Sequence, residues 1–313
     1  MNPAFSVVFL TTLLGAGQGL FLALYAAQWI TAHYAPRLAP PPAFLIAGAL
    51  VSAALVAGGL VASFFHLGRP ERAWRAASQW RTSWLSREVI ALPAFLGAVI
   101  LYAAALAYAP DWAMLVGAVG SVLCVALFVC TGMVYACIRF LQEWATPLTL
   151  VNFALLGLAS GTTLAAALAG AQSPMLAYAF AMAAFAFTFA AFVGRAASLR
   201  RNATLRPKST LQSAIGVKHP RIAQKAQGFM GGSFNTREFF HGVSRAKMFA
   251  IRRGFLLGTF AIPLALLATA VAGGAYALCA LAFAVQYAGL VAERWYFLAD
   301  ANHPQNLYYQ AMS

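Results

Sequence analysis

Long apolar runs alternate with short polar segments along most of this chain. A helix needs about 20 largely uncharged residues to cross a bilayer, and eight runs come close to this length or exceed it: 5–30, 43–65, 89–109, 113–138, 147–170, 175–193, 254–272 and 275–292. Each should be a helix, because an open strand in hydrocarbon leaves backbone groups unpaired. The pattern predicts an all-α integral membrane protein, an eight-transmembrane-helix bundle with no acidic or basic residue inside any span.

The longest polar segment divides the chain. We expect residues 1–193 to form a six-helix transmembrane part, 194–253 a basic cytoplasmic docking loop, and 254–313 two closing transmembrane helices with a C-terminal tail. The first run lacks a preceding basic segment and is long enough to span, so a retained helix is expected rather than a signal peptide. Gly15-x-x-x-Gly19 and Gly157-x-x-x-Gly161 offer small faces for close helix contact, but this common motif identifies no particular partner.

Composition and charge support the same class. The 313 residues are 62% hydrophobic and 9% charged, whereas soluble domains are about a quarter charged. A water-soluble enzyme, a disordered chain and a disulfide-stapled domain are therefore excluded. The net charge is +14, and every Lys and Arg except Arg37 falls on the side shared by the two termini. The positive-inside rule thus predicts that both termini are cytoplasmic.

Residues 194–253 combine positive charge with closely spaced aromatic side chains. A loop that only contacts solvent or anionic lipid is the plainer interpretation. Aromatic residues, Met and Arg are enriched at protein interfaces, however, which favours a docking surface for another subunit. No nucleic-acid module is recognisable. The docking residues that we expect, in this segment and in the loop after the second span, are Phe229, Phe234, Arg237, Phe239, Phe240, His241, Arg72, Arg75 and Arg81.

The boundary between the second and third spans carries the candidate chemistry. His66 ends one span and Glu88 begins the next on the same side. Histidine exchanges a proton near neutral pH, and a nearby carboxylate can orient it or take that proton. With Trp80 and Trp84 as flat apolar walls, these groups fit a quinone headgroup whose tail lies in lipid.

Plainer roles exist for each of these residues. Tryptophan is common at membrane interfaces, and a lone interfacial histidine is often structural. Ser86 could cap a helix whose dipole favours Glu88. From the residues alone, both the quinone site and these structural roles stay open.

We expect no haem, iron–sulfur cluster or other metal site within the chain. None of its five histidines lies in mid-span, whereas membrane haem b takes axial ligands from facing spans. The cysteines form no C-x-x-C group. Proton pumps and ion-coupled transporters place ionisable groups at membrane depth, and the absence of such groups from the apolar runs disfavours a transporter.

The same boundary resembles a known family. His66-Leu67-Gly68-Arg69-Pro70 with Arg72-Ala73-Trp74, followed by Leu85-Ser86-Arg87-Glu88-Val89, is similar to the membrane-anchor subunit of the dimethyl sulfoxide reductase type, and length and plan agree over essentially the whole chain. The resemblance implies a haem-free subunit without terminal-substrate chemistry. Such a subunit holds a molybdopterin catalytic subunit and an iron–sulfur subunit at the membrane and exchanges electrons between a [4Fe-4S] cluster and the quinone pool.

The resemblance makes His66 and Glu88 candidates for quinone binding. Around them we place Trp84 and Ser86, with Arg69 and Arg87 to polarise the carbonyls or to hold the partner. The quinone would be ubiquinone or menaquinone.

Members of this family differ in electron direction. Dimethyl sulfoxide reductases oxidise menaquinol and hold their catalytic part outside the cytoplasm, whereas cytoplasmic sulfite dehydrogenases reduce quinone. Because charge places the boundary and the long loop on the cytoplasmic side, we expect the sulfite-oxidising type, in the bacterial inner (plasma) membrane. The alternatives are a menaquinol-oxidising anchor of a dimethyl sulfoxide or polysulfide-type reductase and, in another class, a stand-alone membrane transporter.

Overall fold

The computed structural model describes residues 1–225 and 238–308. Its bundle helices are α1 (Phe5–Tyr34), α2 (Pro42–Phe64), α3 (Trp84–Tyr108), α4 (Pro110–Ala136), α5 (Pro147–Ala169), α6 (Pro174–Ala203), α9 (Arg245–Leu256), α10 (Ile262–Gly273) and α11 (Leu278–Ala299). The π-helical turn η3 (Leu257–Ala261) joins α9 to α10. Shorter elements are η1 (Pro36–Leu38), η2 (Pro70–Gln79), α7 (Leu211–Ile215) and η4 (Pro304–Tyr308). The all-α expectation is thus confirmed for the described residues.

Seven helices in the described part of the chain are long and apolar enough to cross a membrane, counting Arg245–Gly273 as one. The expected eighth span corresponds to α11, which has 22 residues but is not among the seven. Its last turns carry Glu293 and Arg294, which lower its hydropathy. The count of eight membrane spans stays a prediction.

The expectation that the spans carry no charge is wrong for the helices as they form. α3 begins before Glu88, α6 continues past Arg195, and α11 includes Glu293 and Arg294. All four side chains are buried. The apolar runs end where charge appears in the sequence, but the helices continue because those charges find partners inside the bundle. The helices also take up both ends of the expected docking loop and leave residues 204–244 between α6 and α9.

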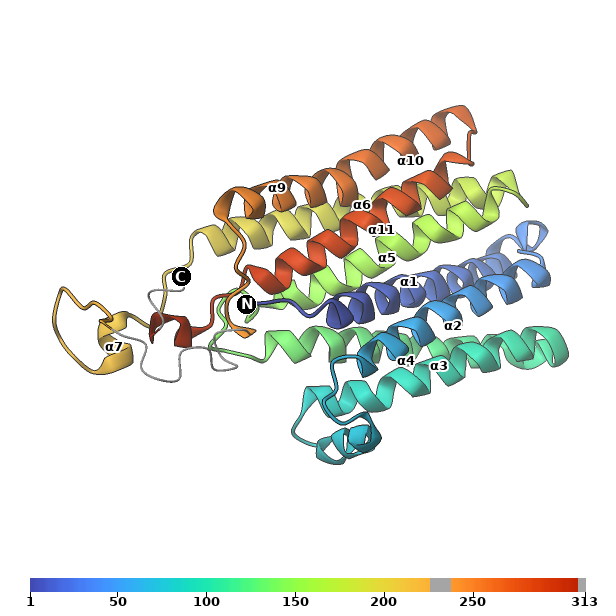
Figure 1. Cartoon of the computed structure of the whole chain (residues 1–313). Coiled ribbons are helices and arrows are strands. Elements are labelled where there is room, and N and C mark those ends of the chain that lie inside the picture. The colour runs from blue at the N-terminus through green and yellow to red at the C-terminus, as the bar shows by residue number, and fades with distance from the viewer. Residues whose placement is uncertain (226–237, 309–313) are drawn as a thin grey trace.

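The bundle has two unlike ends (Figure 1). Residue 1, η2, α7 and the C-terminal segment gather at one end, which we call the terminal end. The connections α1–α2, α3–α4, α5–α6 and α10–α11 lie at the opposite end. Charged side chains at the opposite end, in the described part of the chain, are those of Arg37 and Asp111. The charge asymmetry along the sequence therefore becomes an asymmetry between the two ends.

Local sequence signals start most of these helices. A proline at the first position needs no hydrogen-bond partner for its nitrogen and has its φ already near the helical value; it opens α2, α4, α5 and α6. Side chains accept hydrogen bonds from the first turns of four of the bundle helices, which satisfies otherwise unpaired backbone donors. These capping residues are Ser83 for α3, Thr146 for α5, Ser173 for α6 and Ser244 for α9.

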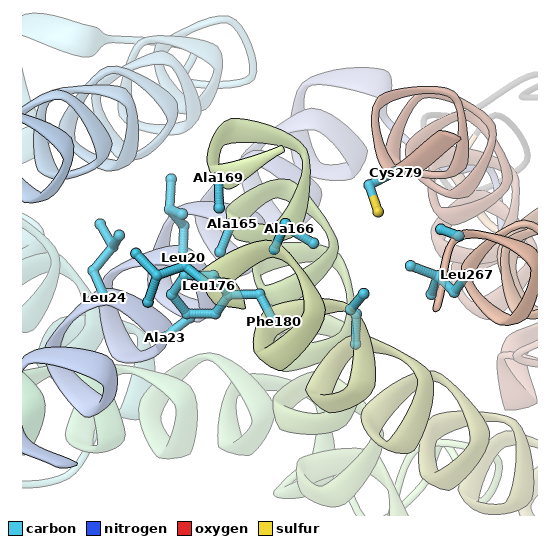
Figure 2. Close-up of a cluster of buried hydrophobic side chains, with 14 of the residues drawn as sticks. Leu20, Ala23, Leu24, Ala165, Ala166, Ala169, Leu176, Phe180, Leu267 and Cys279 are labelled. Atoms are coloured by element: carbon cyan, nitrogen blue, oxygen red, sulfur yellow. The ribbon is translucent and has the colours of Figure 1, made fainter. Parts of the chain in front are cut away.

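α1 and α5 cross in close contact where the two Gly-x-x-x-Gly motifs meet. A Cβ added at Gly161 would overlap backbone atoms of Gly19 and Leu20, and one added at Gly19 would overlap the backbone of Gly157. Small residues continue this close packing. Figure 2 shows Ala165, Ala166 and Ala169 of α5 beside side chains of α1 and α6, with Leu267 and Cys279 at the edge of the same cluster.

Gly161→Ala should destabilise the protein, because its methyl group meets backbone that cannot move aside. Overpacking of this kind costs about 1–3 kcal/mol. The melting temperature of the purified chain in detergent measures the loss. Gly97→Ala is the matched control, since a Cβ at Gly97 on α3 meets no atom within 4 Å. Equal melting temperatures for the two variants would show that the crossing tolerates a wider spacing.

Candidate functional site

Glu88 is a buried carboxylate near the terminal end. It lies on α3 four residues after Trp84, about 6 Å along the helix at 1.5 Å per residue. The residue is only 7% exposed. The Thr131 hydroxyl of α4 donates a hydrogen bond of 2.6 Å to Glu88 Oε1. A carboxylate held this way can accept and release a proton without direct access to bulk water.

Trp84 and Arg87 cover the start of α3. The Arg87 guanidinium lies 4.2 Å from the centroid of the Trp84 ring, and it donates hydrogen bonds of 2.9 Å to the carbonyls of Trp80 and Arg81. The Arg87 guanidinium is therefore already bound to neighbouring groups of the same chain. Ser86 is buried, but Ser83 is the residue whose side chain caps α3, so the capping role considered for Ser86 is wrong.

His66 lies just beyond the end of α2, at the same end of the bundle. Its side chain is exposed, and partial desolvation lowers the pKa of its imidazole below the ordinary value. The neutral ring, which can accept a proton, is thus favoured at pH 7. Within the described residues, no hydrogen bond or ion pair joins His66 to Glu88.

An apolar groove of about 380 Å³ runs between α1 and α2 and ends at Phe65, next to His66. Sequence reasoning did not find it, because it forms where two helices from separate apolar runs meet. Such a groove suits a hydrocarbon tail rather than a polar solute. It is lined by Ser6, Phe9, Leu13, Gly58, Val61, Ala62 and Phe65.

The expected docking arginines of η2 and its neighbourhood are paired with adjacent side chains. Arg75 lies 5.5 Å from the Trp74 ring centroid, Arg81 lies 5.4 Å from that of Trp80, and Arg72 is 3.8 Å from Glu71. Arg69, at the N-cap position of η2, is exposed. Trp74 is 70% exposed. These residues present a basic and aromatic surface at the terminal end.

The expected docking residues of the long segment fall into two groups. Phe229, Phe234 and Arg237 lie outside the described residues. Phe239 stacks on His303 with ring centroids 3.9 Å apart. His241 is half-buried, with its ring 6.3 Å from that of Trp295, and Phe240 is half-buried too. This part of the segment thus packs on the chain's own C-terminal region.

A second charged group, missed from the sequence, lies between α6 and α11. Arg195 Nε is 2.7 Å from Glu293 Oε1, and Arg294 Nε is 3.9 Å from Glu293 Oε2. The three residues are between 1% and 3% exposed. The signal for this group in the sequence was weak. Glu293 directly follows an apolar run and Arg195 lies two residues after another, at positions where charge is usually interfacial.

Aromatic rings surround this charged group. The Arg294 guanidinium lies 3.7 Å from the Phe153 ring centroid, and Arg195 lies 5.6 Å from that of Phe255. Cation–π contacts offset part of the cost of removing the arginines from water. The ion pair does the same for Glu293, since a buried charge without a partner is strongly destabilising.

Arg195→Met should lower the free energy of unfolding by about 3–5 kcal/mol, because it leaves Glu293 buried without its closest partner. The melting temperature in detergent should fall accordingly. Arg200→Met is the matched control on the same helix, since Arg200 is exposed. A melting temperature equal to that of this control would mean that the pair contributes nothing to stability.

Comparison with known proteins shows to which family the chain belongs. Residues 1–220 match the family described as DMSO reductase anchor subunit (DmsC). The chain belongs to this family. It is 50% identical to a sulfite dehydrogenase subunit of Allochromatium vinosum over 327 aligned residues, which cover 100% of both chains.

Membership in the anchor family accounts for both the apolar helices and the basic end of the bundle. The chain is a multi-pass membrane protein and the membrane anchor of a molybdoenzyme, which associates with catalytic and electron-transfer subunits. The resemblance drawn from His66 to Pro70 and from Leu85 to Val89 is confirmed at the level of the family.

Proposed function

We propose that the chain passes electrons from a [4Fe-4S] cluster of an iron–sulfur partner to a quinone bound near His66, Trp84 and Glu88. The quinone is ubiquinone or menaquinone from the membrane pool. The observation that carries this proposal is the buried Glu88 carboxylate, held by Thr131 at the end of the bundle that carries the exposed basic and aromatic surface. A group that can exchange protons thus lies at the same end of the bundle as this surface.

The groove between α1 and α2 supports the fit of a quinone. It is apolar and ends at Phe65, so it can hold an isoprenoid tail while the headgroup lies near His66. Trp84, with Arg87 against its ring, gives a flat wall. Ser86 belongs to the same turn, and Arg69 is free to polarise a carbonyl or to contact the partner.

In the proposed reaction, the electrons released at one site of the complex are taken up at another. In a molybdopterin subunit, sulfite and water give sulfate, two protons and two electrons. At this chain, quinone takes two electrons from the partner cluster and two protons to become quinol. The similarity to a sulfite dehydrogenase subunit supports this direction over menaquinol oxidation. The surface formed by Arg72, Arg75, Arg81 and the segment around Phe239 would hold the iron–sulfur subunit on the cytoplasmic side of the bacterial inner membrane.

His66→Ala should abolish quinone-coupled sulfite oxidation, because the reduced quinone ring loses an imidazole that takes up a proton from water and passes it on. The whole complex is assayed in membranes with a quinone analogue and, separately, with an artificial acceptor that bypasses this chain. Activity with the artificial acceptor and membrane attachment should persist. His33→Ala is the matched control, because His33 is an exposed histidine at the opposite end. Wild-type quinone turnover in His66→Ala would remove His66 from the site.

A stand-alone transporter is the second candidate, and the buried Arg195, Glu293 and Arg294 favour it. Transporter sites lie near the bilayer midplane, however. Glu293 lies only about 9 Å from the end of α11 at 1.5 Å per residue. Purification from native membranes separates the candidates. An anchor should bring molybdenum and iron with it, whereas a chain that purifies alone and metal-free would support the transporter.

A further inference from the structure

A layer of buried polar side chains crosses the bundle just inside the terminal end. Glu88 of α3 and Thr131 of α4 lie at one side of the bundle, and Arg195 of α6 with Glu293 of α11 at the other. With Arg294, the layer contains two acidic and two basic side chains, so its charges balance. Burying charged side chains is costly unless they are paired. The pair Glu88 and Thr131 and the pair Arg195 and Glu293 lie at a similar depth from the terminal end.

Tyr135 connects the two halves of this layer. It lies on α4 one helical turn after Thr131, the hydrogen-bond partner of Glu88. It is buried, and its ring lies 5.5 Å from that of Phe297 on α11. Its ring stacks on Phe153, with centroids 5.4 Å apart, and Phe153 also contacts Arg294. A single phenol group thus stands between the candidate quinone site and the buried charged group.

The charged group also connects to water at the terminal end. The Tyr296 ring lies 6.0 Å from the Arg195 guanidinium. Tyr296 and Asp300 line a cavity of about 120 Å³. This cavity shares Glu143, Asn202 and Asn302 with a surface cavity of about 460 Å³. Solvent can therefore approach the layer from this end.

Several buried polar atoms in and beside the layer have no hydrogen-bond partner within the described part of the chain. They include Arg195 Nη2, Glu293 Oε2, Arg294 Nε and Asn152 Oδ1. Buried polar atoms are almost always satisfied, by ordered water where protein groups do not reach them. The unsatisfied donors and acceptors of Arg195, Glu293 and Arg294 therefore offer positions for ordered water around Glu293.

We propose that this layer is the route by which protons reach the quinone site from the terminal end. It runs from Asp300 and the cavity around it, through Glu293 and its water, to Tyr135 and then to Glu88. The inference rests on the proposed function and deepens it, since reduction of one quinone by two electrons from the partner cluster requires two protons. Glu88 hands on each proton and regains one through Tyr135.

The arginines have a different part in this route. A guanidinium does not release its proton in proteins, so Arg195 and Arg294 cannot carry protons. They hold Glu293 in place, orient the water, and keep the layer neutral when both carboxylates are ionised. Glu293, Glu88 and the Tyr135 phenol are the groups that exchange protons.

Tyr135→Phe tests the route, because it removes the phenol hydroxyl and leaves the ring packing in place. In the membrane-bound complex, quinone turnover should fall about tenfold or more, as expected when a positioned proton donor is lost. The solvent deuterium isotope effect on that turnover should rise, since protonation becomes rate-limiting. Activity with an artificial acceptor should stay unchanged, which separates this effect from loss of structure.

Tyr102→Phe is the matched control. Tyr102 is also a fully buried tyrosine, and it donates a hydrogen bond to Gln28 Oε1 at 2.7 Å outside the layer. This variant should keep wild-type turnover and a wild-type isotope effect. Glu293→Gln should behave like Tyr135→Phe and extends the test to the far half of the layer.

The outcomes distinguish the route from the quinone site. If Glu88→Gln abolishes quinone turnover while Tyr135→Phe and Glu293→Gln keep wild-type turnover and isotope effect, the route is wrong and the site stands. If Glu88→Gln itself keeps wild-type turnover, the proposed site fails and the route fails with it. Loss of turnover and a raised isotope effect in both layer variants support the route.

Discussion

The contact between the glycines of α1 and α5 sets the spacing on which the rest of the bundle depends. At Gly19 and Gly161 no side chain separates the two backbones, so the helices approach more closely than any other residue would allow. α1 also contacts α2, α4 and α11, and α5 contacts α4, α6 and α11. Because both helices contact α4 and α11, their spacing bears on how near α4 comes to α11, where the Tyr135 ring contacts that of Phe297.

Charge inside this bundle is tolerated only where the chain supplies its own partners. Glu88 has Thr131, and Glu293 has Arg195 and Arg294, whose guanidinium groups lie over aromatic rings. Hydrocarbon offers no such partners, so each of these groups faces the interior. Their shared depth near the terminal end gives the protein a polar layer beside a basic surface, an arrangement that suits exchange of electrons and protons with a partner at that surface.

The placement of His66, Trp84 and Glu88 at one end of the bundle could be predicted from the sequence, because they lie within one loop and the helix turns beside it. Their part in binding a quinone stays a prediction. The groove between α1 and α2 could not be predicted, since its walls come from two helices whose facing sides the apolar pattern leaves undefined. The contact of Arg195 with Glu293 was hidden for a similar reason. The two residues are far apart along the chain, and each follows an apolar run at a position typical of an exposed interfacial charge.

The sequence by itself determined the number and order of the apolar runs and the segregation of basic residues to one end. It also determined that the segment from His66 to Val89 resembles the anchor family. These features depend on composition and on spacing between residues close in the sequence. They therefore do not depend on how the helices pack against one another. Only the tertiary structure decided that one glycine motif packs on the other, that Glu293 meets Arg195, and that Tyr135 lies between two charged groups. Helical periodicity tells which residues share a face, but the partner of that face is chosen by the packing of all the helices together.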